Sequence, residues 1–207
     1  MLVRSIWFGN AEQQDTFLHE CRRFLHHFRT PFPAAPLPAT LAAHDRPPKE
    51  TKMATNPETR LTELGITLPV PAAAVANYVP SVLTGSLLFV SGQLPLENGK
   101  AAVVGRLGDT VTIEDGVRAA RLCGLNLLAQ ARAACGGDLN RVKRLVRMTA
   151  FVAGTPDFFD QPKVVNGASD LMVEVLGEAG RHARVAVGVA ALPLNVAVEI
   201  EAIFEIA

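Results

Sequence analysis

The clearest pattern in the sequence is an alternation of apolar residues with polar or small ones near its end. The alternation runs over residues 184–189 and again over residues 198–206, and a period of two is typical of strands with one buried face. If a turn at residues 192–195 pairs the two strands, their valine and isoleucine faces pack against a helix-covered core. Arg184 and Glu199 are then expected together on the opposite face.

Earlier strands are predicted at residues 86–92 and 142–152, which are rich in aliphatic residues. Between them, Asn98-Gly99 is a strong signal for a two-residue type I′ turn. This turn predicts a hairpin in which the strand at residues 86–92 pairs with residues 101–104.

Two long helices and one short helix are predicted from apolar residues at helical spacing. The first long helix covers residues 112–135 and begins with a threonine that can cap it. The second covers residues 155–177 and begins with Thr-Pro-Asp, a capping residue followed by a first-turn proline. The short helix is expected at residues 59–65.

The order of these elements is strand, strand, helix, strand, helix, strand, strand, which predicts an α+β or α/β sandwich with one exposed sheet face. Each long helix can cover one face of a single sheet, so we expect two helices packed on one face. The other sheet face is left uncovered. Closed self-association is the commonest way to cover such a face.

Residues 1–52 differ in character from the rest of the chain. They hold four of the five histidines and six of the 14 prolines, and we expect residues 1–58 to be a disordered extension ahead of one domain at residues 59–207. The extension is a targeting peptide, an interaction arm, or an upstream addition to a chain that starts at Met53. Acidic residues such as Glu12 and the lack of an apolar secretory core favour the third explanation.

Composition excludes several classes of function. The 207 residues are 49% hydrophobic, which is enough for a sizeable core. The 20 basic and 20 acidic residues leave no net charge, and the basic residues at 141–147 do not share one face, which argues against a nucleic-acid partner. No apolar segment is long enough for a membrane span, and the three cysteines show neither metal-ligand spacing nor a disulfide framework.

Arg184 and Glu199 are the best candidates for chemistry. Small residues on the same strand leave room for a small ligand, and a planar guanidinium can grip a carboxylate through two parallel hydrogen bonds. The alternative is a structural ion pair between subunits, from Arg184 to Glu199 or Glu201. His182 shares a strand face with Arg184, so it is either an acid or base or a hydrogen-bonded structural histidine.

Several short motifs, taken in their order and spacing, resemble the RidA/YjgF family of enamine/imine deaminases. The motifs are Tyr78-Val79, Ser91-Gly92-Gln93-Leu94-Pro95, Asn166, Ala183-Arg184, Leu192-Pro193 and Val198-Glu199-Ile200-Glu201-Ala202. The resemblance covers about residues 60 to 207. It implies a chorismate-mutase-like α+β fold and a homotrimer with three clefts between subunits.

The resemblance also implies roles for individual residues. In the family, the arginine that matches Arg184 binds the substrate carboxylate, and the residue that matches Glu199 positions or activates the attacking water. Four more positions match residues that line the same cleft: Tyr78, Ser91, Gly92 and Asn166.

The implied substrates are 2-imino acids and their enamine tautomers, such as 2-aminoacrylate released by pyridoxal-phosphate dehydratases. They are hydrolysed to 2-keto acids and ammonia, which protects pyridoxal-phosphate enzymes. An imine is already electrophilic, so holding it beside water and a carboxylate base is most of the catalytic task. No metal or organic cofactor is expected. The expected location of the protein is the cytoplasm.

Two positions depart from the family pattern and define a distinct branch. Ala186 replaces a cysteine that is common in the family, and Gly188 replaces a frequent acidic residue. The loss of the thiol leaves the arginine and glutamate mechanism intact. Two other functions remain open: a non-catalytic trimer that binds or senses small carboxylates, and the ribonuclease activity attached to relatives, against which the neutral charge argues.

Overall fold

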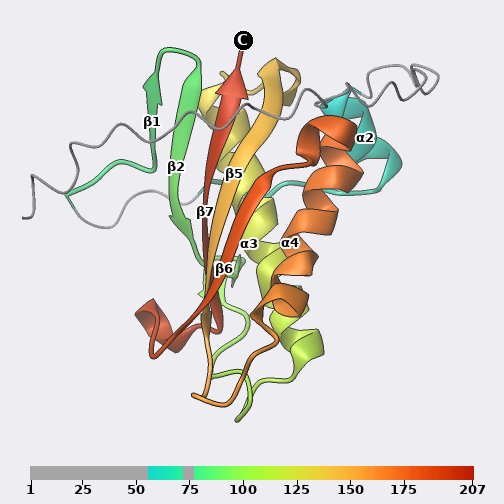
Figure 1. Ribbon diagram of the computed structural model, residues 1–207. Helices are drawn as coiled ribbons and strands as arrows, with labels where there is room; N and C mark the ends of the chain where they lie inside the picture. Colours follow the sequence, from blue (N-terminus) through green and yellow to red (C-terminus); the bar gives the residue numbers. More distant parts are fainter. Residues whose placement is uncertain (1–55, 72–76) are drawn as a thin grey trace, which may run out of the picture. The chain divides into compact units, whose positions relative to one another are not determined.

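The computed structural model describes residues 56–71 and 77–207. Within these residues the main sheet has five strands in the order β1-β2-β7-β5-β6, antiparallel except for the parallel pair β5 and β6 (Figure 1). The strands are β1 Ser81–Thr84, β2 Leu87–Gln93, β5 Val142–Ala153, β6 Ala183–Val189 and β7 Val198–Ile206. The disorder predicted for residues 1–55 and the alternative start at Met53 lie outside the described residues. The prediction of disorder is wrong at residues 57 and 58, because these belong to the helix α2 (Pro57–Glu63).

Two long helices, α3 (Ile113–Ala134) and α4 (Gln161–Leu176), pack against each other on one side of the sheet (Figure 1). Their apolar stripes and the facing strand residues form the core, in which Leu127, Leu171 and Phe204 are fully buried. The predicted α+β fold with two helices on one face is therefore confirmed. None of the helices in the described ranges combines the length and hydropathy that crossing a membrane requires.

The helix ends agree with the prediction at α3 but not at α4. Thr112 caps α3, since its Oγ accepts a hydrogen bond of 3.1 Å from the backbone N–H of Asp115. The predicted start of the next helix at residue 155 is wrong, because α4 begins only at Gln161. Pro162 explains the delay: it has no N–H to donate, so it fits the first turn of a helix but not the interior of one that began earlier.

The Asn-Gly turn is present, but it joins other strands than predicted. Asn98 and Gly99 have φ values of 52° and 76°, as a type I′ turn requires. They connect β3 (Leu96–Glu97) to β4 (Lys100–Ala101) in a separate small sheet. The predicted pairing of residues 86–92 with residues 101–104 is wrong, because β2 pairs instead with β7 and with β1, a short exposed strand that the sequence did not signal.

The predicted pairing of the last two strands is also wrong. β7 lies in the middle of the sheet between β2 and β5, whereas β6 forms its edge beside β5 (Figure 1). β5, α4 and β6 make a crossover between parallel strands, which carries β6 to the outer side of β5. The segment between β6 and β7, with a short 3₁₀ turn at Pro193–Asn195, then returns the chain to the centre.

The two faces of β6 are consequently the reverse of the prediction. Val185 and Val187 are 36% and 41% exposed and lie on the open face of the sheet, while Ala186 packs toward the helices. Arg184 aligns with the buried Met148 of β5, so it too lies on the helix side. For β7 the prediction is confirmed, since Val198, Ile200, Ala202, Phe204 and Ile206 are buried in the core.

The open face of the sheet carries exposed apolar side chains. Val82, Phe89 and Ile203 lie in register across β1, β2 and β7, and Val185 and Val187 continue the apolar surface on β6. No helix among the described residues covers this face (Figure 1).

The short helix α2 (Pro57–Glu63) is tied to the domain by polar contacts. The Glu58 carboxylate accepts hydrogen bonds of 2.9 Å from Arg132 Nε, at the end of α3, and from the backbone N–H of Leu139. Leu139 begins the 3₁₀ turn Leu139–Arg141, and a second one, Gly177–Gly180, follows α4.

Candidate functional site

The predicted site residues form two separate groups. The first, which we call the arginine cluster, consists of Arg184 on β6, Asn166 and Ser169 on α4, and His182 just before β6. Arg184 Nη1 donates hydrogen bonds to Asn166 Oδ1 at 2.9 Å and to Ser169 Oγ at 3.0 Å, and Nη2 donates to the Pro162 carbonyl at 3.4 Å. The guanidinium is thus held by α4 from one side.

His182 is the fourth member of the arginine cluster. Its Nδ1 is 2.7 Å from the Gly180 carbonyl oxygen, and its Nε2 is 3.3 Å from Ser169 Oγ. Burial lowers the pKa of His182 and the nearby Arg184 charge lowers it further, although the hydrogen bond to Gly180 acts in the opposite direction. The neutral imidazole is therefore the favoured form.

The second group, the glutamate cluster, consists of Glu199 on β7, Ser91 and Gly92 on β2, and Tyr78. A register shift between Val90 and Gln93 places a bulge at the β2 residues. A Cβ built on Gly92 would lie 3.0 Å from Glu199 Cδ and 3.2 Å from its Cγ, with the carboxylate oxygen closer still. Only glycine therefore lets the carboxylate lie against this backbone.

Ser91 and Tyr78 lie near the same end of β2. Ser91 Oγ donates a hydrogen bond of 2.9 Å to the Val79 carbonyl, which ties β2 to the segment after Tyr78. Tyr78 itself is 54% exposed. Burial raises the pKa of Glu199, and the neighbouring Glu201 raises it further, so this carboxyl is a stronger base than an ordinary glutamate.

The two clusters lie on opposite faces of the sheet. Glu199 aligns with Phe151 and through it with Val187 on the open face, whereas Arg184 lies on the helix side. Two strand spacings and three residues along β6 separate them, which puts their Cα atoms about 14 Å apart. The prediction that Arg184 and Glu199 lie together on one face is therefore wrong within a single chain.

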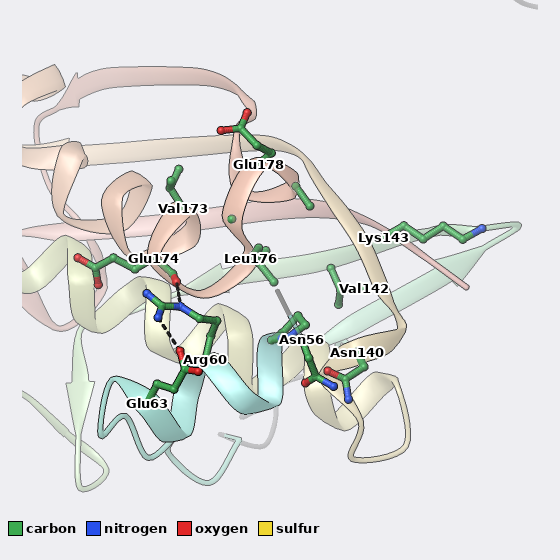
Figure 2. Close-up of a pocket in the computed structure, with 13 residues that line it drawn as sticks. Asn56, Arg60, Glu63, Asn140, Val142, Lys143, Val173, Glu174, Leu176 and Glu178 are labelled. Carbon is green, nitrogen blue, oxygen red and sulfur yellow. Dashed lines mark hydrogen bonds and ion pairs between the residues drawn. The ribbon is translucent and has the colours of Figure 1, made fainter. Parts of the chain in front are cut away.

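A cavity of about 790 Å³ lies elsewhere, between α2, α4 and the two 3₁₀ turns that follow α3 and α4 (Figure 2). None of the predicted site residues lines it. Arg60 in its wall is bonded to Glu63 at 2.7 Å and to the Glu174 carbonyl at 3.2 Å, as the dashed lines in Figure 2 show. Arg60 is thus bonded to its own neighbours, and the cavity is not the predicted site.

Ser169 is the member of the arginine cluster to which sequence analysis assigned no role. It follows Asn166 by three residues on α4, a spacing that puts both side chains on one helix face. This spacing was the available signal, but only the fold shows that the face meets Arg184.

The sequence profile of a family described as "YjgF/chorismate mutase-like, putative endoribonuclease" matches residues 58–206. The chain belongs to the RidA/YjgF family. "Protein TCP17" of Trypanosoma cruzi is 50% identical to it over 147 residues, which are 70% of this chain and 91% of that protein. The RidA/YjgF match thus includes both clusters.

Two solved structures are similar to this chain in sequence and fold. A protein of unknown function from Agrobacterium tumefaciens is 54% identical, with a TM-score of 0.69 over 73% of this chain and 92% of its own. A Shewanella oneidensis protein described as "a putative endoribonuclease" is 40% identical, with a TM-score of 0.70 over 73% of this chain and 99% of its own. The chain therefore has the same fold as these two proteins.

Proposed function

We propose that the protein hydrolyses 2-imino acids and their enamine tautomers, such as 2-aminoacrylate, to 2-keto acids and ammonia, and so protects pyridoxal-phosphate enzymes. The observation that carries the proposal is the Glu199 carboxyl. It is partly buried, has a raised pKa and rests against Gly92, at the position where the RidA/YjgF resemblance implies activation of water. A cytoplasmic location goes with this function.

The proposal requires the two clusters to meet between subunits. In one chain they are about 14 Å apart on opposite faces, too far to hold one small substrate. We propose a homotrimer in which the arginine cluster of one subunit faces the glutamate cluster of the next. The exposed apolar residues of the open face, such as Phe89 and Val187, favour burial of that face in such an assembly.

Each side chain then has a chemical task. The Arg184 guanidinium binds the substrate carboxylate, and Glu199 takes a proton from a water molecule as the water oxygen attacks the imine carbon. Glu199 returns this proton to the nitrogen, which gives a neutral carbinolamine. The hydroxyl proton then passes through Glu199 to the nitrogen as the C–N bond breaks, so that ammonia leaves and the carbon becomes the 2-keto carbonyl. Tyr78, Ser91 and Asn166 line the cleft and position the substrate, so the rate gain comes mainly from orientation and proton transfer.

The test is the release of pyruvate from 2-aminoacrylate generated in situ by a serine dehydratase. Wild-type protein should accelerate the release, whereas Arg184→Ala and Glu199→Gln should not, although both keep the wild-type oligomeric state. Wild-type protein that binds pyruvate but accelerates nothing would contradict the proposal and indicate a carboxylate-binding trimer instead.

A further inference from the structure

Hydrogen-bond donors and acceptors in the arginine cluster can be assigned one by one. Arg184 Nη1 has two protons, and Asn166 Oδ1 and Ser169 Oγ accept one each. Nη2 gives one of its protons to the Pro162 carbonyl. Within the described part of the chain, Nε–H binds no acceptor, and Nη2, which lies on the same edge of the guanidinium as Nε, keeps one proton without an acceptor.

The contacts of His182 fix its tautomer. The Gly180 carbonyl can only accept, so the 2.7 Å contact places the proton on Nδ1 and leaves Nε2 as an acceptor in the neutral ring. This carbonyl is rigidly placed, because Gly180 packs directly on the backbone of Met172 in α4, where no Cβ would fit.

Ser169 connects the histidine to the arginine. Its Oγ accepts from Arg184 Nη1, so its own proton is free to donate to His182 Nε2 at 3.3 Å. The bonds therefore run in one direction, from Arg184 to Ser169, then to His182, then to the Gly180 carbonyl. A hydroxyl rotates freely, and His182 is the group that turns the lone pair of Ser169 toward the guanidinium.

We propose that His182 is a positioning residue for Arg184: through the Ser169 hydroxyl it holds the guanidinium so that Nε and Nη2 face the carboxylate of a 2-imino or 2-keto acid. The inference rests on the proposed function as far as the ligand class is concerned. It assigns His182 no proton transfer to the substrate, and it gives the arginine cluster a defined binding edge.

The surroundings of His182 agree with this role. Arg184 is the charged side chain that acts on it, and its repulsion, together with burial, favours the neutral ring. A protonated His182 ring would donate Nε2–H to Ser169 Oγ. The hydroxyl would then receive donors from two cations, His182 and Arg184, and its own proton would have no acceptor in the ring.

Two substitutions at one position separate positioning from a structural role. Glutamine places its terminal amide near the site of Nε2 and can accept from Ser169, whereas asparagine matches Nδ1 and keeps only the bond to Gly180. We therefore expect His182→Gln to bind pyruvate nearly as well as wild type and His182→Asn about fivefold more weakly, the effect of one lost hydrogen bond. In hydrolysis the same loss should raise KM and leave kcat almost unchanged.

A matched pair at the middle residue completes the test, with binding of pyruvate followed by calorimetry on the full chain. Ser169→Ala should also bind about fivefold more weakly, Ser169→Thr should bind normally, and the Ser169→Ala/His182→Asn double variant should be no weaker than Ser169→Ala alone. Equal affinities for His182→Asn and His182→Gln, or additive losses in the double variant, would overturn the inference. Wild-type binding that depends on Arg184 without hydrolysis would overturn only the proposed function, whereas absence of such binding would overturn both.

Discussion

Replacing Gly92 by alanine is the sharpest perturbation of the glutamate cluster. The new methyl group would lie 3.0 Å from Glu199 Cδ and 3.2 Å from Cγ, with the carboxylate oxygen closer still. The clash involves the end of a flexible side chain, and Gly92 is not among the glycines with positive φ. The backbone can therefore accommodate alanine, and the Glu199 carboxylate moves away from the new methyl group.

The size of the effect follows from this displacement. Relief of the contacts to ordinary van der Waals separation requires the carboxylate to move by about 1 Å, and a misplacement of that size costs about 10²-fold in rate. Removal of the base altogether by Glu199→Gln should cost about 10²- to 10⁴-fold. Gly92→Ala should thus lose much of the kcat while the midpoint of thermal unfolding shifts only slightly.

The assay is kcat for imine hydrolysis in a double-mutant cycle with Glu199→Gln. Because both changes act on one carboxyl, the double variant should be scarcely slower than Glu199→Gln alone. Gly154→Ala is the control, since the atoms nearest to its Cβ, in Phe158 and the Leu107 carbonyl, would lie at 3.4–3.6 Å, which is ordinary van der Waals contact. Full activity of Gly92→Ala, or losses that multiply in the double variant, would refute the role given to this contact.

Three further predictions concern stability and binding. Folding raises the pKa of the Glu199 carboxyl, so the stability that this carboxyl contributes is fully present below its unfolded pKa and is lost as the pH rises through its folded pKa. Glu199→Gln should therefore unfold at a higher temperature than wild type at pH 8. The difference between the two unfolding temperatures should vanish near about pH 4. Glu58→Ala leaves the Leu139 N–H without its acceptor and should lower the free energy of unfolding by about 1–3 kcal/mol in urea titrations, whereas the exposed Glu63→Ala should change it little. Arg184→Lys keeps the charge but removes the planar fork, so calorimetry should find pyruvate bound about tenfold more weakly; unchanged affinity would show that the fork is not used.

The sequence predicted most of the longer helices and strands but not which strands lie next to one another. The period of two correctly identified the strands β6 and β7, because alternation follows from strand geometry alone. The alternation could not reveal which face of β6 is buried, because the residues that alternate from Val185 and those that alternate from Arg184 are equally regular in their spacing. The parallel crossover through α4 decided that question, and it lies outside any local pattern.

In the candidate site, too, the sequence predicts some residues, whereas their contacts depend on the fold. Two pairs of residues matched by the RidA/YjgF resemblance are in contact: Asn166 with Arg184, and Gly92 with Glu199. The bracing of Arg184 by Ser169 and the contact between Gly92 and Glu199 depend on helix placement and on a bulge in β2. Such features arise from tertiary packing, which single-residue propensities do not encode.

The most direct test of a cleft shared between subunits is a mixing experiment. Arg184→Ala and Glu199→Gln chains, each inactive alone, are co-expressed in equal amounts and assayed for pyruvate release. If each cleft takes Arg184 from one subunit and Glu199 from the next, about a quarter of the clefts in randomly mixed assemblies are intact, and about a quarter of the wild-type activity should return. If both residues serve from the same chain, no intact cleft forms, and a mixture as inactive as its components would contradict the proposed site.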